Sequence, residues 1–176
     1  LVGSEMCIRD RDNASHTGML WAKYLYPNQG QYSAAMNDDA LCPIIFRYAE
    51  ILLTKAECLV ELNQDLQEAM NIIDRLRLRG GHIAVDRSKY DTQAKVRELV
   101  RRERTIELAG EGFRGDDMTR YSDDYWKEHM NNVPIMTPDG DTELTMKWSS
   151  RMRLKPIPQT AIDLNPLLAG DQNPGY

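Results

Sequence analysis

The sequence of 176 residues lacks the features that mark several large classes of protein. It has no run of about 18 apolar residues, so it predicts no membrane-spanning helix. The net charge of −5 argues against a general nucleic-acid binder, which would carry a basic face. The three histidines are scattered without ligand spacing, and there is no Gly-x-Ser-x-Gly, P-loop or dinucleotide motif. We therefore expect no metal and no cofactor.

Cysteine is scarce as well. The three cysteines form no Cys-x-x-Cys spacing, which argues against zinc and redox motifs. Cys58 lies within an apolar helical pattern, so we expect it to be a buried free thiol. Cys7 lies in residues 1–12, LVGSEMCIRDRD, which show no periodicity and no signal-peptide pattern. We interpret residues 1–12 as an artefact or a disordered segment and assign the folded domain to residues 13–176.

Two segments with helical periodicity follow a region of loops, residues 13–43, in which a short strand is possible at 20–25. Apolar residues at spacings of three and four predict an amphipathic helix over residues 44–62, followed by a second over 66–79. Asp65 is placed to cap the second helix, and Gly80-Gly81 to end it. The predicted apolar faces are Ile45, Tyr48, Ala49, Leu52, Ala56 and Leu59 in the first helix and Leu66, Ala69, Met70, Ile73 and Leu76 in the second. The pair is typical of a tetratricopeptide-like hairpin, which cannot bury its faces alone.

A third helix is predicted over residues 92–108, ended by Gly110 and Gly112. Its predicted apolar stripe contains Val96, Leu99, Val100, Glu103 and Ile106, so that one carboxylate lies among apolar side chains. Residues 113–153 give weaker signals: a short helix at 121–130 and a surface turn at 139–143, which lacks the full pattern of a calcium loop. The proline-rich residues 152–176 predict an extended strap over the helical body, with a turn at 160–165.

Four motifs between residues 44 and 176 carry a resemblance. The C-terminal stretches RLKPIPQ (153–159), IDLNPL (162–167) and QNPGY (172–176) resemble the end of SusD/RagB family proteins. IIFRYAEILL (44–53) and NIIDRLR (71–77) are similar to two helices of that family. RER, ELA and EGFR, at 102–104, 107–109 and 111–114, resemble a third. The chain is thus identified as similar to the C-terminal part of a SusD/RagB protein.

The resemblance implies a fold and a function. The fold would be mostly α, a tetratricopeptide-like helical body with long loops and an extended C-terminal strap. The protein would be a surface-exposed outer-membrane lipoprotein that binds oligosaccharides, or peptides in some members, and has no catalytic activity. Its partner would be a SusC-like TonB-dependent transporter, and its lipid anchor and signal peptide would lie outside these residues.

Charged residues around RRERTIELAGEGFR (101–114) allow two interpretations. Glu107 and Glu111, four apart on one helical face, could act as the carboxylate pair of a glycoside hydrolase. Nearby arginines would keep these carboxylates ionised, which opposes the raised pKa that a general acid needs. We favour a structural ion-pair network that consists of Arg47, Glu50, Arg104, Glu107, Glu111 and Arg114.

Four aromatic residues are candidates for ligand contact, because loop aromatics can stack on sugar rings. They are Trp126, Trp148, Tyr121 and Tyr125. The alternative is that these rings pin loops to the core. A tetratricopeptide-type scaffold for protein partners is a further hypothesis, but it predicts more hairpins at a period near 34 residues than the one that we identify.

Overall fold

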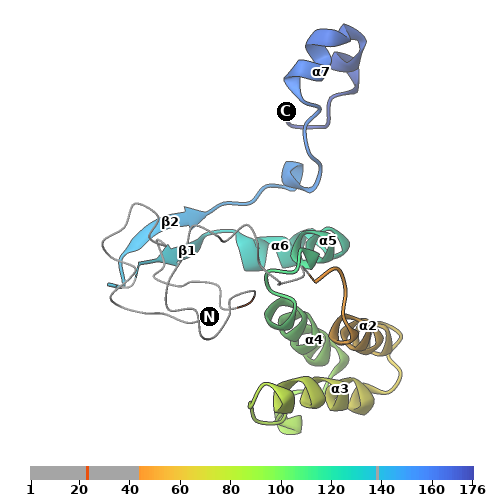
Figure 1. Ribbon diagram of the computed structural model, residues 1–176. Coiled ribbons are helices and arrows are strands. Elements are labelled where there is room, and N and C mark those ends of the chain that lie inside the picture. The colour runs from red at the N-terminus through yellow and green to blue at the C-terminus, as the bar shows by residue number, and fades with distance from the viewer. Residues whose placement is uncertain (1–22, 24–43, 138) are drawn as a thin grey trace, which may run out of the picture. The chain divides into compact units, whose positions relative to one another are not determined.

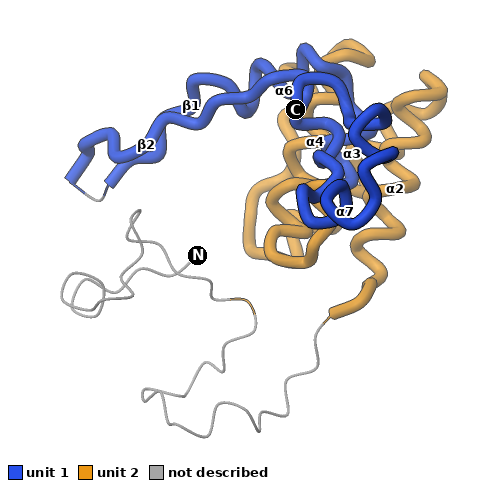
Figure 2. The backbone as a smooth tube through the Cα atoms, turned by 90° about the horizontal axis from the view of Figure 1, so that it is seen from above, with its two compact units in different colours: residues 1–22, 116–176 blue, residues 23–115 orange. Residues whose placement is uncertain are grey.

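The computed structural model describes Lys23, residues 44–137 and residues 139–176 (Figure 1). The possible strand at 20–25, apart from Lys23, and the segment 1–12 lie outside the described residues. The chain divides into two compact units, which Figure 2 colours separately. One comprises residues 23–115, and the other comprises residues 1–22 and 116–176.

In the described part of the first unit, three α-helices form its body: α2 (Tyr48–Glu61), α3 (Leu66–Arg79) and α4 (Gln93–Glu107). α2 and α3 form the predicted hairpin, and α4 packs against both of them. The three helices bury one continuous core, which holds Ala49, Leu52, Leu53, Ala56, Val60, Ala69, Met70, Ile72, Ile73, Leu76, Val96, Leu99, Val100 and Leu108. The helical periodicity of the sequence is therefore confirmed in all three segments.

The predicted face of α2 is partly wrong. The helix begins at Tyr48 instead of Ile44, and both Ile45 and Tyr48 are exposed. The buried residues are instead Ala49, Leu52, Leu53, Ala56 and Val60. Because α3 and α4 cover only one side of α2, the apolar residues on its other side remain outside the core of this unit.

Two further burial predictions are wrong for the same reason. Cys58 is exposed on α2, not buried. Ile106, expected on the apolar stripe of α4, is also exposed, whereas Glu103 is buried as expected. Both exposed side chains lie outside the core that the described helices of this unit share.

Local signals at the helix ends agree with the sequence. The Asp65 carboxylate accepts a hydrogen bond from the Glu68 N–H at 2.9 Å, as an N-cap residue does. Thr92 accepts one from the Lys95 N–H at 3.4 Å at the start of α4. α3 ends before Gly81, whose φ of 75° favours glycine.

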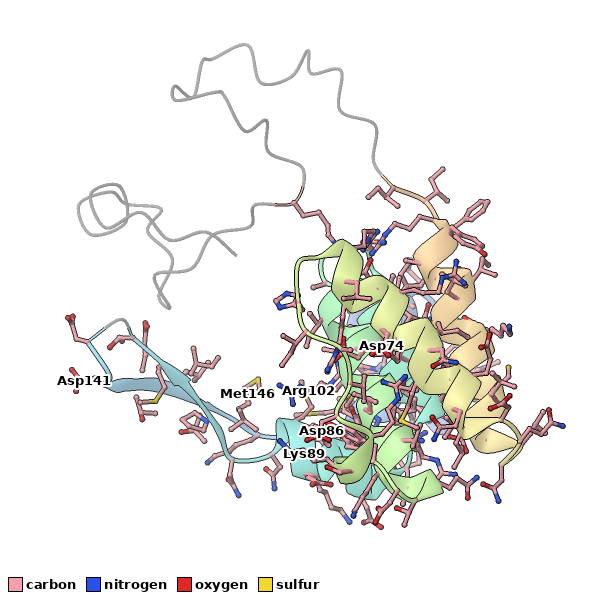
Figure 3. All side chains as sticks on the ribbon, turned by 90° about the horizontal axis from the view of Figure 1, so that it is seen from below. Asp74, Asp86, Lys89, Arg102, Asp141 and Met146 are labelled. Atoms are coloured by element: carbon pink, nitrogen blue, oxygen red, sulfur yellow. The ribbon has the colours of Figure 1, made fainter. Side chains whose placement is uncertain are left out.

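The loop between α3 and α4, which contains the short helix η1 (Arg87–Lys89), is held by Asp74 of α3 (Figure 3). Asp74 accepts a hydrogen bond from the Val85 N–H at 2.6 Å and pairs with Arg87 at 2.6 Å. Burial would raise the pKa of Asp74, but these two donors outweigh it and lower that pKa. Asp74 therefore fixes the loop as an ionised carboxylate.

The second unit contains short elements. α5 (Phe113–Arg120) crosses from the first unit, and α6 (Asp123–Met130) confirms the short helix predicted at 121–130. Strands β1 (Val133–Met136) and β2 (Thr142–Met146) form an antiparallel hairpin with Val133 opposite Met146. Gly140, with φ 89°, lies in the turn between them, where a surface turn was predicted. α5 and the hairpin were not predicted, because both are short.

The C-terminal residues differ from the predicted extended strap. They contain η2 (Ser150–Arg153), α7 (Gln159–Leu164) and η3 (Pro166–Asp171). The turn predicted at 160–165 is thus largely helix α7, and Asn165 and Pro166 begin η3 in the positions that favour helix starts.

Side-chain amides close this C-terminal segment into a loop. Gln172 accepts from the Ile157 N–H at 2.8 Å and donates to the Ile157 carbonyl at 3.2 Å. Asn173 donates to the Lys155 carbonyl at 2.6 Å, and Arg151 to the Gly175 carbonyl at 3.0 Å. Hydrogen bonds from side chains to the backbone therefore hold the two ends of residues 151–176 together.

Replacing Asp65 by alanine tests the cap between α2 and α3. The Asp65→Ala variant should lose about 1 kcal/mol of unfolding free energy, because the Glu68 N–H loses its acceptor. Urea unfolding followed by circular dichroism measures the loss. Asp65→Asn is the control, since asparagine caps helices equally well. Equal destabilisation by both substitutions would contradict the capping role.

Candidate functional site

The carboxylates considered for catalysis lie where α4 ends. Glu107 is the last residue of α4, and Glu111 lies in the turn that follows. Gly110 and Gly112, with φ of 77° and 88°, redirect the chain on either side of Glu111. The two carboxylates therefore do not share one helical face, which corrects that expectation. They meet because the turn brings Glu111 to the same cation as Glu107.

That cation is Arg47, the residue that precedes the first turn of α2. Its Nε donates to both carboxylate oxygens of Glu111 at 2.9 Å. Its two terminal nitrogens bind the Glu107 side chain and, at 2.5 Å, the Glu107 backbone carbonyl. The planar guanidinium thus joins the start of α2 to the end of α4 through several donors at once.

Two more cations complete the group. The Lys23 ammonium donates to Glu111 at 2.5 Å and to the carbonyls of Glu107 and Ala109 at 3.0 and 2.9 Å. Arg79, the last residue of α3, binds the Glu107 carboxylate. Cations are favourable here because the last carbonyls of a helix carry partial negative charge. We refer to Lys23, Arg47, Arg79, Glu107 and Glu111 as the carboxylate cluster.

Burial and charge act in opposite directions on Glu111. Its side chain is fully buried, with an exposed fraction of 0%. Burial alone would raise the pKa of Glu111, but the hydrogen bonds and charges of Arg47 and Lys23 outweigh it and lower that pKa. A general acid needs the opposite shift, so Glu111 is poorly suited to donate a proton at neutral pH.

The other predicted members of the ion-pair network lie nearby with different partners. Arg104 is buried and lies 3.8 Å from Glu50, with a hydrogen bond to the Thr54 hydroxyl at 3.1 Å. Arg114 donates to the Thr105 hydroxyl at 2.8 Å. The six predicted residues thus all lie in the first unit, and five of them form the direct pairs Arg47–Glu107, Arg47–Glu111 and Arg104–Glu50.

Three cations of this region were missed by the sequence analysis. Arg77 binds the buried Glu103, with its Nε 3.0 Å from the carboxylate, and Arg79 and Lys23 bind the cluster. Arg77 and Arg79 could have been found, because basic residues in the last turn of a helix often face nearby carbonyls and carboxylates. Lys23 carries no such signal, since 88 positions separate it from Glu111.

The four candidate aromatic residues lie in the second unit. Tyr121 and Tyr125 pack edge to face with ring centroids 4.8 Å apart, and Trp126 and Trp148 stack at 5.9 Å. The Trp126 indole N–H donates to the Met118 carbonyl at 2.5 Å. Tyr125 and Trp126 belong to helix α6, as the short helix predicted at 121–130 implies, and they are therefore not loop aromatics.

The four rings differ in how far they are buried. Tyr121, Tyr125 and Trp148 are buried, and Trp126 is half-buried. Tyr121 and Tyr125 form the small core of this unit together with Met118. Arg153 reinforces it by donating to the carbonyls of Tyr121 and Thr119 at 3.0 and 2.6 Å. Of the four, Trp126 keeps the most accessible surface.

Within the described parts of the chain, no helix is long and apolar enough to cross a bilayer. The same residues contain no group of three or more histidine, cysteine, aspartate or glutamate side chains placed to hold a metal ion.

Comparison with known proteins identifies the family. The sequence profile of the SusD family matches residues 3–176. The chain belongs to the SusD family. It is 32% identical to SusD-like protein P2 of Formosa agariphila over 138 residues, which are 76% of this chain and 26% of that protein. A crystal structure of a SusD-like protein from Bacteroides fragilis is similar with a TM-score of 0.57 and 31% identity, covering 76% of this chain and 26% of that one.

The chain therefore spans about a quarter of the length of these SusD-like relatives. The resemblance found in the sequence is confirmed, and so is the mostly helical fold. Its motifs lie at Arg47 and the start of α2, in α3, at the end of α4 with the start of α5, and in the C-terminal loop. Three residues of the carboxylate cluster, Arg47, Glu107 and Glu111, lie in two of these motifs.

Replacing Glu111 by glutamine tests the cluster. The variant removes the carboxylate charge that Lys23 binds and one of the two that Arg47 binds, so it should lose about 3–5 kcal/mol of unfolding free energy at pH 7. Glu68→Gln is the matched control, because Glu68 pairs with Lys55 at 3.0 Å on the surface. An exposed pair of this kind contributes less than about 1 kcal/mol. Urea unfolding measures both, and equal losses would contradict the structural role of Glu111.

The stability difference between wild type and Glu111→Gln should depend on pH. The pKa of Glu111 is lowered in the folded state from an ordinary value of 4.5, so its contribution is complete well above pH 4.5. That contribution is lost as the pH falls through the folded-state pKa. The stability difference between wild type and Glu111→Gln should therefore shrink between pH 6 and pH 3, about where carboxylates titrate. A difference that stays constant over this range would argue against an ionised Glu111.

Proposed function

We propose that this chain is the C-terminal part of a non-catalytic cell-surface protein that captures oligosaccharides or other nutrients. In this proposal the protein delivers its ligand to a SusC-like TonB-dependent transporter and is held at the outer membrane by a lipid anchor outside these residues. In this proposal residues 13–176 are the C-terminal part of the SusD-like domain. Membership of the SusD family over residues 3–176 is the observation that carries the proposal.

The chemistry of the carboxylate cluster supports a role without catalysis. Glycoside hydrolysis requires one carboxylic acid that holds a proton and one carboxylate that is free to act. Here Glu111 is buried between Arg47 and Lys23, and Glu107 is bound by Arg47 and Arg79. The cations lower the pKa of Glu111, and both carboxylates have structural partners. The cluster is better suited to joining helices than to turning over a substrate.

The aromatic residues support a limited role in binding. A ring can stack on a sugar only if one of its faces or edges is accessible. Tyr121, Tyr125 and Trp148 are buried, so in this proposal they support the second unit from within. Trp126 is half-buried, and we assign it the ligand contact among the four candidates.

A binding assay combined with a hydrolysis assay tests the proposed function. The full-length protein, with the remainder of its reading frame, should bind one class of oligosaccharide in isothermal titration calorimetry without releasing reducing sugar. Glu107→Gln should leave the affinity unchanged, because the Glu107 carboxylate is bound by Arg47 and Arg79. Release of reducing sugar that disappears in Glu107→Gln would replace the binding function with glycoside hydrolysis.

Two tryptophan substitutions separate ligand contact from packing. Trp126→Ala should weaken oligosaccharide affinity by about tenfold or more, which corresponds to about 1.4 kcal/mol. Trp148→Phe keeps a buried ring, so it should lower the Tm while leaving the affinity unchanged. Both affinities are measured well below the Tm of each variant, which circular dichroism provides. Unchanged affinity in Trp126→Ala would remove this residue from the binding site.

A further inference from the structure

The Lys23 ammonium lies among three oxygen atoms at the end of α4. Its nitrogen is 3.0 Å from the Glu107 carbonyl oxygen, 2.9 Å from the Ala109 carbonyl oxygen and 2.5 Å from Oε1 of Glu111. We name these three oxygen atoms the oxygen cradle. A lysine ammonium has three N–H donors and no acceptor, so three oxygens satisfy it completely. The cradle is therefore matched in number to the hydrogens of a primary ammonium group.

The oxygen cradle concentrates negative charge. Two of its atoms are backbone carbonyls at the C-terminal end of a helix, where carbonyls lack an N–H partner from the next turn and carry partial negative charge. Glu111 adds the charge of a fully buried carboxylate, and a buried charge is costly unless it is paired and hydrogen-bonded. Arg47 binds both oxygens of this carboxylate through its Nε. The remaining negative charge of the cradle favours a second cation.

The three oxygens are held in place by groups other than Lys23. Two of them belong to the backbone that ends α4, and Glu111 is fixed by Arg47 and by its own N–H, which donates to the Leu108 carbonyl at 3.1 Å. Lys23 reaches the cradle from a position 88 residues earlier in the sequence. Its side chain is 29% exposed, whereas that of Glu111 is 0% exposed. The cation position is therefore accessible from solvent, although the carboxylate itself is buried.

We propose that the oxygen cradle is a binding site for a primary ammonium group and that Lys23 is its built-in occupant. When the lysine side chain is removed, a small free alkylammonium ion takes its place. An ammonium suits the site because it is a compact charge that directs three donors from one nitrogen, whereas the planar guanidinium of arginine matches a carboxylate edge. The site thus holds residue 23 to the end of α4 by charge and hydrogen bonds. This inference does not depend on the proposed binding of nutrients.

Chemical rescue of Lys23→Ala in the full-length protein tests the site. The substitution should lower the Tm by a few degrees, because the buried Glu111 loses one of its cations. Methylammonium chloride should restore most of this loss with a saturable dependence on concentration, and it should leave the wild-type Tm unchanged. Tetramethylammonium chloride at the same ionic strength is the control salt, because this cation has no N–H donor. Lys55→Ala is the matched control variant, since Lys55 pairs with Glu68 at the surface, and methylammonium should not change its Tm.

Three results of the rescue experiment would overturn the proposal. Equal restoration by the two salts would assign the effect to ionic strength instead of a site. A Tm of Lys23→Ala equal to that of the wild type would mean that the ammonium is not bound in the cradle. A lowered Tm that methylammonium does not restore would mean that the three oxygens do not form a cation site without the lysine side chain.

A measurement on the wild-type side chain keeps the proposal testable even if Lys23→Ala does not fold. Acetic anhydride labels lysine amines, and mass spectrometry gives the rate at each position of the full-length protein. Lys23 should react at least about tenfold more slowly than Lys55, because its nitrogen must first leave three acceptors. Glu111→Gln should accelerate the labelling of Lys23 and leave that of Lys55 unchanged. Equal wild-type rates at the two lysines, or an unchanged Lys23 rate in Glu111→Gln, would contradict the proposed site.

Discussion

The contact between Arg47 and the end of α4 holds the start of α2 against the end of α4 in the first unit. One guanidinium binds the side chains of Glu107 and Glu111 and the last helical carbonyl, so it fixes the residue before α2 against the turn after α4. The requirement is electrostatic, because two carboxylates and a helix C-terminus concentrate negative charge at one point. Arg47, Lys23 and Arg79 supply the cations that make this arrangement stable. Once they are bound, the carboxylates have little freedom to act in catalysis.

The sequence predicts the three helices because their buried residues recur with the period of a helix. α3 and α4 each have one apolar stripe, so the predicted faces are largely correct apart from Ile106. α2 has two stripes, and a periodicity argument merges them into one broad face that includes Ile45 and Tyr48. Which stripe is buried in this unit depends on where α3 and α4 lie, and this is a property of tertiary packing.

The candidate site could be predicted only in part, for a related reason. Arg47, Glu107 and Glu111 lie in recognisable motifs, but Lys23 reaches the cluster from a distant position without a local signal. For the aromatic residues, composition is compatible with both a ligand platform and a small core. For Tyr121 and Tyr125 the structure decides in favour of the core, because both are buried and pack with Met118. No period in the sequence distinguishes a buried ring from an exposed one in so short a segment.

The ion pairs at the start of α2 and the exposed apolar side chains beside them have a common origin in the conformation of Arg47. Its backbone is extended, with φ −148° and ψ 165°, and neighbouring side chains of an extended backbone point to opposite sides. Because Arg47 turns inward to the carboxylate cluster, Phe46 and Tyr48 turn away from it and remain exposed. The polar contact that closes this unit therefore also sets the direction in which its apolar surface is presented.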